Sequence, residues 1–236
     1  MRILLFLALT LSAQTRLYFG TSAAPVNPAF QTGWEDNSAG QRFKLNDVKG
    51  STAIAAGQTV VIAEDTGNQD LDRQYVSTRM NAGIMFITAT TSMKAVVMMR
   101  EFAGTDDVTM CITGVRIMSE DGLTERASLF SVANYGPVLE FINNATMRNK
   151  QCSDGDLSLA TYTTVLGDRL VIELGYQTDA LETTPEAAGK WGENATDCAE
   201  NETNTTDCAG WIEFSVTITF AGELATAQGV YRGRVR

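Results

Sequence analysis

The chain contains no histidine among its 236 residues. This absence excludes Ser-His-Asp and Cys-His nucleophile activation, zinc sites with histidine ligands and histidine general bases. The sequence also lacks the motifs G-x-S-x-G, G-x-x-x-x-G-K-[ST] and G-x-G-x-x-G. Paired carboxylates could still act as a glycosidase, but nothing selects one pair among the 28 acids. We therefore predict a protein that is not an enzyme, with no catalytic residue, cofactor or metal.

Basic residues are scarce. The chain has 18 Lys and Arg but 28 Asp and Glu, which gives it a net charge of −10. Phosphate binding needs clustered Lys and Arg, so nucleic acid is excluded as a partner. Eight of the acids lie between Asp179 and Asp207, where Lys190 is the one basic residue. We interpret that segment as a solvated surface loop; a cation site is the alternative. The acids Asp65, Asp70 and Asp72 are better explained by a polar turn than by calcium ligands.

Cysteines are few, and none forms a C-x-x-C pair. Zinc and thioredoxin-like roles are therefore not indicated. The short spacing of Cys198 and Cys208 predicts a local disulfide, which leaves Cys111 to pair with Cys152. The disulfide between Cys198 and Cys208 should stabilise the fold by about 2–3 kcal/mol, because closing this loop lowers the entropy of the unfolded chain. Cysteine pairing favours an oxidising, extracellular setting.

Long hydrophobic runs are absent except at the N-terminus, where residues 1–14 form an apolar leader that includes Ile3, Leu4, Leu5, Phe6 and Leu7. The leader is too short to predict stable membrane insertion. It reads either as a secretory signal with a poor cleavage site after Ala13, or as a strand donated to a neighbouring copy. Residues 223–236 form a tail in which Arg232, Arg234 and Arg236 share one face if extended. The tail is either solvated or an assembly contact with the acidic loop of another copy.

Between these ends, residues 15–222 read as one domain, because no linker rich in Gly, Ser or Pro and no internal repeat interrupts them. A hydrophobic content of 44% is enough for a sizeable core. The sequence from Trp211 to Phe220 alternates strictly, with Ile212, Phe214 and Ile218 on one face, which predicts a half-buried strand. Ten or more such strands, separated by turn residues, predict an all-β fold: a single antiparallel β-sandwich of jelly-roll type. The predicted strands are Thr15–Phe19, Arg42–Val48, Gln58–Ala63, Gln74–Arg79, Ile84–Thr90, Lys94–Ala103, Val108–Met118, Ala127–Ala133, Val138–Asn143, Leu157–Val165, Arg169–Gln177 and Trp211–Phe220.

Four sequons for N-linked glycosylation occur, at Asn144, Asn194, Asn201 and Asn204. Three of them lie within one stretch of eleven residues in the predicted disulfide loop, more than the short motif would produce there by chance. N-linked glycans are therefore a predicted modification. The methionines, in contrast, are predicted to fill the core, because they are spread over successive strands.

A set of segments occurs in a recognisable order: Thr15-Arg-Leu-Tyr-Phe19, Ala24-Pro-Val with Pro28-Ala-Phe30, Gly33-Trp-Glu35, Lys49-Gly50, Gly167-Asp-Arg-Leu-Val-Ile-Glu-Leu-Gly-Tyr176 and Trp211-Ile-Glu-Phe-Ser215. In these segments the chain resembles a group of largely uncharacterised β-sandwich proteins of tailed-phage and environmental genomes, regarded as virion structural components. The resemblance runs diffusely from Thr15 to Phe220. It implies assembly rather than catalysis. The leader, the cysteines and the Arg-rich tail depart from the pattern and favour an extracellular fibril.

These features together predict a non-catalytic structural protomer that associates with copies of itself. The expected assembly is an extracellular helical fibril or a virion-like array, found as a secreted or surface filament or in a virion. The alternative from another class is a carbohydrate-binding or adhesion module, in which Trp34, Trp191 and Trp211 would stack on sugars.

Overall fold

The computed structural model describes residues 14–31, 36–37, 42–50, 59–63, 69–101, 108–131, 146–152, 156–178, 186–190, 192 and 194–223. In this part of the chain every regular element is a strand, which confirms the all-β prediction. The strands are β1 (Thr15–Ala23), β2 (Asp36–Asn37), β3 (Arg42–Asn46), β4 (Thr59–Ala63), β5 (Gln69–Ser77), β6 (Met85–Phe86), β7 (Ser92–Glu101), β8 (Val108–Met118), β9 (Glu125–Ser131), β10 (Arg148–Gln151), β11 (Leu157–Ser158), β12 (Tyr162–Thr163), β13 (Arg169–Thr178), β14 (Glu186–Lys190) and β15 (Trp211–Phe214).

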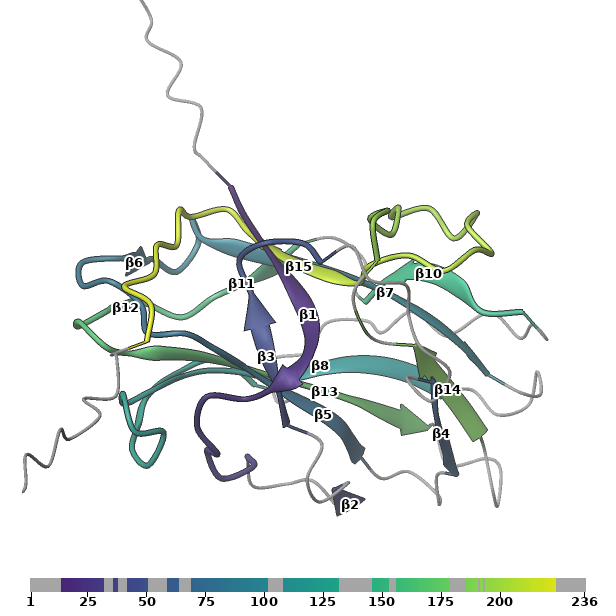
Figure 1. Cartoon of the computed structure of the whole chain (residues 1–236), viewed down its shortest axis with the longest axis horizontal. Helices are drawn as coiled ribbons and strands as arrows, with labels where there is room; N and C mark the ends of the chain where they lie inside the picture. Colours follow the sequence, from purple (N-terminus) through teal and green to yellow (C-terminus); the bar gives the residue numbers. More distant parts are fainter. Residues whose placement is uncertain are drawn as a thin grey trace, which may run out of the picture.

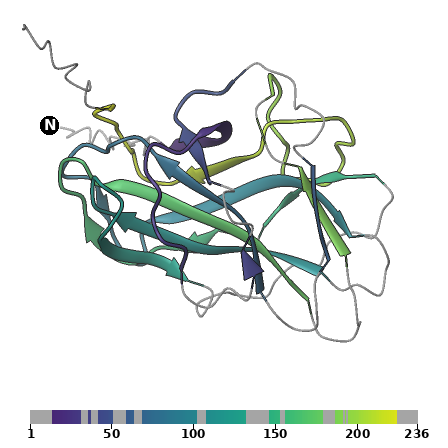
Figure 2. The same cartoon turned by 60° about the horizontal axis from the view of Figure 1, so that its bottom comes forward.

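Thirteen of the strands form one sheet, which curls until it is nearly a barrel (Figures 1 and 2). The order along the sheet is β4-β14-β7-β15-β1-β3-β5-β13-β8-β9, with β10 and β11 also pairing with β7 and β2 with β5. A separate pair joins β6 to β12. The pairing is mostly antiparallel, but β2 and β3 run parallel to β5, unlike the purely antiparallel prediction. The jelly-roll topology stays a prediction.

The inside of the curled sheet holds the main hydrophobic core, and strict alternation along the strands builds it. Leu17 and Phe19 of β1, Ile172 and Leu174 of β13, and Ile212 of β15 all belong to it and are fully buried. Period-two side-chain placement puts every second residue of a strand on this face. Most of the methionines are also buried, as predicted, although Met85 is exposed.

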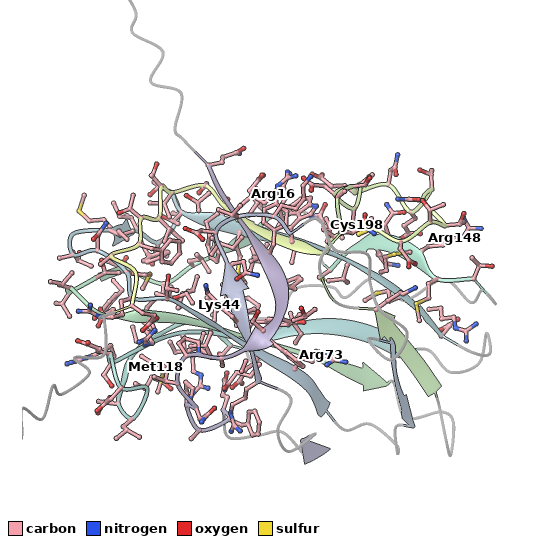
Figure 3. The ribbon with its side chains drawn as sticks, in the orientation of Figure 1. Arg16, Lys44, Arg73, Met118, Arg148 and Cys198 are labelled. Carbon is pink, nitrogen blue, oxygen red and sulfur yellow. A yellow bond between two sulfur atoms is a disulfide. The ribbon has the colours of Figure 1, made fainter. Side chains whose placement is uncertain are left out.

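Two central strands are buried on both faces, a feature that simple alternation does not explain. In β7 the whole run from Ala95 to Met99 is buried, and in β13 the run from Leu170 to Leu174 is buried. Consecutive apolar residues mark strands that are covered on both sides. On the outer face two segments supply the cover, and we name them the cap (residues 194–210) and the strap (residues 24–31). In Figure 3, Cys198 of the cap lies above and to the right of the centre, and Met118, which lies beneath the strap, lies at the lower left.

The strap crosses β5, β13 and β8 over a buried ion pair. Arg116 Nη2 donates to Glu173 Oε1 at 2.6 Å and to the Ala29 carbonyl at 2.8 Å. Glu173, which is fully buried, also accepts the Gln31 backbone N–H at 3.1 Å and the Gln74 side-chain amide at 2.8 Å. Val26 at the other end of the strap packs on a small apolar cluster of Val76, Met118 and Val171.

The last strand is shorter than the alternation predicts. β15 ends at Phe214, and the chain from Ser215 to Phe220 continues irregularly. Ile218 still reaches the core, where its backbone N–H donates to Thr15 Oγ1 at 2.7 Å. The face assignment is therefore confirmed while the predicted length is wrong, because the chain leaves β7 after Ser215 and Phe220 forms an isolated bridge with Met80. Strands β10 and β14 were not predicted, and the first lacks the β-branched and aromatic residues that favour strands.

Candidate functional site: the disulfide-linked cap

The cap interrupts what would otherwise be a nearly continuous strand. Lys190, the last residue of β14, faces Met98 of β7, and Trp211, the first residue of β15, faces Val96. β10 pairs with the same two residues of β7 and so occupies its other edge. Strands β14 and β15 therefore lie end to end along one edge of β7, and the cap is an excursion from that edge.

The floor of the cap is a second hydrophobic cluster on the outer face. It comprises Val96, Met98 and Trp211 from the sheet with Cys198 and Cys208 from the cap, and all five are at most 2% exposed. The indole N–H of Trp211 donates to the Cys198 carbonyl at 2.7 Å. An acidic, polar loop was not expected to contribute to any core, so the structure corrects that interpretation.

The disulfide between Cys198 and Cys208 is present, as predicted. It closes the cap directly above Val96 and Met98, where it replaces the large apolar side chains that the loop lacks. Cys152 is also buried, but the side chain of Cys111 lies outside the described residues. The pairing of Cys111 with Cys152 stays a prediction.

Around this floor, acids of the cap pair with four bases from different strands of the sheet and with Lys49, which lies in the segment after β3. The pairs are Asp197 with Arg16 (2.9 Å) and Lys49 (2.8 Å), Glu200 with Lys94 (2.8 Å), Glu202 with Lys150 (3.1 Å) and Asp207 with Lys190 (2.6 Å). The acids of the cap were expected to be solvated. In the structure four of them also pair with bases of the same chain, which leaves them poorly suited to hold the basic tail of another copy, while Glu200 and Asp207 stay 45% and 41% exposed.

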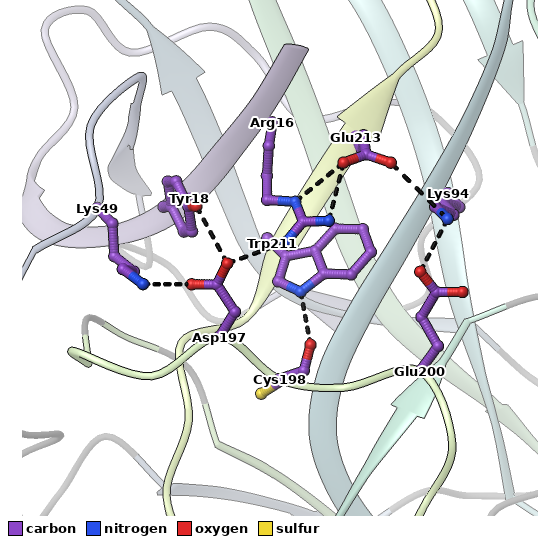
Figure 4. Close-up of polar contacts among 9 residues, drawn as sticks. All are labelled: Arg16, Tyr18, Lys49, Lys94, Asp197, Cys198, Glu200, Trp211 and Glu213. Carbon is purple, nitrogen blue, oxygen red and sulfur yellow. Dashed lines mark hydrogen bonds and ion pairs between the residues drawn. The ribbon is translucent and has the colours of Figure 1, made fainter. Parts of the chain in front are cut away.

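Arg16 of β1 is the centre of this network (Figure 4). Its guanidinium lies 3.8 Å from the centroid of the Trp211 ring and donates through Nε and Nη2 to Glu213 Oε2 at 3.0 and 2.8 Å. A planar guanidinium suits both contacts, stacking and forked donation, better than an ammonium group does. Burial opposes its charge, but the hydrogen bonds to Glu213 and Asp197 outweigh that effect and raise the pKa of Arg16.

Asp197 carries the matching negative charge. Burial acts to raise the pKa of this carboxyl, but the hydrogen bonds from Lys49 and Arg16 outweigh burial and hold the pKa below its ordinary value. The neighbouring Tyr18 hydroxyl also donates to Asp197, at 3.3 Å, and partial burial raises the pKa of Tyr18. The arrangement favours fixed charges rather than proton transfer near neutral pH.

A buried asparagine of β10 holds the far side of the cap. Asn149 is fully buried, and its side-chain amide donates to the Ala199 carbonyl. Its Oδ1 accepts the backbone N–H of Asn204 at 2.6 Å. One side chain therefore satisfies two backbone groups of an irregular segment, as buried polar groups require.

The predicted glycosylation sites divide between the cap and the rest of the chain. Asn194, Asn201 and Asn204 all lie on the cap, Asn201 exposed and the other two half-buried. Asn144 lies outside the described residues, as do the predicted assembly residues Ile3, Leu4, Leu5, Phe6, Leu7, Arg232, Arg234 and Arg236.

Trp211 does not stack on sugars in this structure, because it is 1% exposed and covered by Arg16. The prediction for this residue in a carbohydrate site is wrong, while Trp34 and Trp191 lie outside the described residues. The residues that sequence reasoning missed are the anchors Arg16, Lys94 and Asn149. The signal that could have found this site is the unbroken apolar run in β7, which required a cover on its outer face.

A shallow depression at the end of the sheet farthest from the cap is the other polar feature. It is lined by Ser119, Glu120, Asp121, Arg126 and Arg169. Its groups already pair with one another or with neighbours, since Arg169 binds Glu223 through two hydrogen bonds of 2.6 and 2.8 Å. Within the described ranges, no three metal-ligating side chains come together as a group.

Comparison with protein-family models finds no match to the chain, and comparison with curated proteins finds none either. No helix in the described part of the chain has the length and hydrophobicity needed to cross a bilayer. The disulfide agrees with an oxidising setting such as the extracellular space.

Proposed function

We propose that the chain is a non-catalytic structural protomer that associates with copies of itself in an extracellular fibril or a virion-like array. The observation that carries the proposal is the grouping of exposed apolar side chains at one end of the molecule. Five large hydrophobic residues there are between 43% and 79% exposed: Met85, Ile87, Leu123, Val165 and Leu166. Exposed apolar residues are ordinary when scattered, but a group of them marks an interaction surface.

Strand β6 with its flanking residues and two neighbouring turns bring these residues together, and we call this region the turn end (residues 84–88, 119–124 and 164–168). Met85 pairs with Thr163, which places it beside the Val165–Leu166 turn. Arg169 pairs with Met118, so the turn that contains Leu123 begins next to the same segment. In Figure 1 the turn end lies along the left side of the view, from the labels β6 and β12 down to the teal loop after β8, and the cap lies at the upper right.

The segment from Gly167 to Tyr176, one of those that carry the resemblance, supports the same proposal. Its charged side chains bond to other groups of the same chain. Asp168 accepts the Tyr162 hydroxyl at 2.8 Å and the Val165 N–H at 2.9 Å. Arg169 binds Glu223, and Glu173 binds Arg116. These groups stabilise the turn end and the strap, which a surface that docks onto another copy needs to keep its shape.

The test measures association of the purified full chain at increasing concentration, by sedimentation velocity and by electron microscopy. We expect oligomers or filaments, and we expect Leu123→Ser with Leu166→Ser to raise the concentration at half-association at least tenfold. Val48→Ser is the matched control, because Val48 is 72% exposed but lies after β3, outside the turn end. A chain that stays monomeric at millimolar concentration, with both termini intact by mass, contradicts the proposal.

A further inference from the structure

Two of the sequons on the cap hold their asparagine side chains in a defined orientation. The hydroxyl of Thr203 donates to Asn201 Oδ1 at 2.8 Å, and the hydroxyl of Thr206 donates to Asn204 Oδ1 at 2.7 Å. The backbone N–H of each threonine donates to the same oxygen, at 3.5 and 2.9 Å. Two donors on Oδ1 turn the oxygen toward the loop. The amide nitrogen on the other branch of the planar carboxamide then points away from it.

The third sequon of the cap lacks one of these contacts. Asn194 Oδ1 accepts the backbone N–H of Thr196 at 3.0 Å. Among the described contacts, no hydrogen bond joins the Thr196 hydroxyl to this oxygen. The pair at Asn201 and Asn204 is therefore distinguished by geometry and not only by the motif, which all three share.

The inner side of the same segment is fixed to the sheet, which leaves its outer side facing solvent. Glu202, between Asn201 and Thr203, has φ of +57° and binds Lys150 at 3.1 Å. Asn149 holds the backbone of Asn204 from below. The side chains of Asn201, Thr203 and Thr206 are exposed. The fold thus directs the middle residue of the first sequon inward and its acceptor asparagine outward.

We propose that Asn201 and Asn204 are acceptors for N-linked glycans, donated by a polyisoprenyl-phosphate-linked oligosaccharide. In the transfer, a bond forms between the asparagine Nδ2 and the anomeric carbon of the first sugar. The bond from that carbon to the phosphate oxygen breaks, and the lipid phosphate leaves with the electron pair. Nδ2 loses one proton to a base of the transferase. The threonine donors to Oδ1 polarise the carbonyl, which makes the N–H easier to deprotonate.

Glycosylation of the cap does not depend on self-assembly, but it limits which surfaces any assembly can use. A glycan is bulky and hydrophilic, so a glycosylated cap faces solvent and stays outside the contact between copies. The contact then falls to other surfaces, such as the turn end.

The test is glycopeptide mass spectrometry of the full chain, expressed behind an added cleavable signal in eukaryotic cells. Protein is recovered from both medium and cells and analysed before and after peptide N-glycosidase treatment in heavy-oxygen water. We expect heavy-oxygen-labelled aspartate at positions 201 and 204, with higher occupancy than at 194. Thr203→Ala and Thr206→Ala each remove the glycan at one site, whereas Thr203→Ser and Thr206→Ser, which keep the hydroxyl, retain it.

A co-expressed secreted glycoprotein shows that the cells glycosylate normally. Unmodified Asn201 and Asn204 beside a fully modified co-expressed protein overturn the proposal. Modification of Asn194 alone also overturns it, because the motif would then act without the side-chain geometry. Neither result bears on sedimentation of the unglycosylated chain, so failure here is separable from failure of the proposed assembly.

Discussion

The cap and the strap cover the outer face of the same sheet by opposite means. The cap places apolar side chains and a disulfide in the middle and its ion pairs at the partly exposed rim. The strap places a charged pair in the middle, where Glu173 is fully buried and the Arg116 side chain is 5% exposed. The position of the charges, at the rim or in the middle, decides how much each contact is worth.

The physical reason is solvent screening. Exposed ion pairs contribute about 0–1 kcal/mol, because water screens them and two long side chains lose entropy. Removing one partner of a buried pair costs about 3–5 kcal/mol, because the other charge stays buried without compensation. We therefore expect the strap to fail at a single residue and the cap to lose stability in smaller steps.

The largest effect is expected for Glu173→Ala. It leaves the Arg116 guanidinium buried and removes the acceptor of the Gln31 N–H, so the free energy of unfolding should fall by about 3–5 kcal/mol. Urea denaturation followed by intrinsic fluorescence measures this. Glu200→Ala, at the rim of the cap, is the matched control: its side chain is 45% exposed, so the loss of its pair with Lys94 should cost about 0–1 kcal/mol. Equal losses for the two variants would remove the distinction between cap and strap.

Removing the disulfide should have the next largest effect. With Cys198→Ser and Cys208→Ser together, the unfolded chain regains the entropy of a loop closed over a sequence separation of 10, worth about 2–3 kcal/mol. Hydrogen exchange should speed up at Ala209 and at the backbone N–H of position 198, both of which bond within the cap. Exchange at Gln31 in the strap should not change. Equal acceleration in both segments would show that they unfold as one unit.

A pH-dependent effect of about 1 kcal/mol is expected for Asp197→Asn. The pKa of Asp197 is lowered in the folded chain, so its stabilising contribution is present above the unfolded pKa of about 3.9 and is lost as pH falls through the folded pKa. The variant should be less stable than the native chain at pH 7, and the difference should shrink at pH 3. Thermal melting at both pH values measures it. If the stability difference between the variant and the native chain grows on acidification, the negative charge assigned to Asp197 is wrong.

The smallest effect is expected for Lys190→Ala, which breaks the pair with Asp207. The Asp207 side chain is 41% exposed, so the loss should be about 0–1 kcal/mol and should vanish in concentrated salt. Denaturation at low and high ionic strength measures it. A loss of more than about 2 kcal/mol would place this pair in the class of the buried one.

Much of the fold follows from local pattern. The range predicted for Val108–Met118 matches β8, and the core face of the final strand is correct through Ile212, Phe214 and Ile218. Such features depend on the period-two geometry of one strand, which the sequence contains in full. The pairing of Cys198 with Cys208 also follows from short spacing, because two nearby cysteines have few other partners.

The candidate site could be predicted only in part. The sequence marked the acidic segment, the cysteines and the sequons, but it assigned Asp197, Glu200 and Glu202 to solvent. Their partners Arg16, Lys94 and Lys150 come from strands that are distant along the chain. Nothing local to the loop specifies which bases it meets.

The sequence by itself therefore determined that the chain is all-β, that one loop carries a disulfide, and which faces of its strands are apolar. Only the tertiary structure decided that this loop folds back over β7 and that the strap crosses β13. The reason is that alternation specifies which side of a strand is buried but not what buries it. The cover for Trp211 depends on pairing between β7, β10 and β15, which joins residues up to 121 positions apart in one sheet, such as Phe214 and Met93.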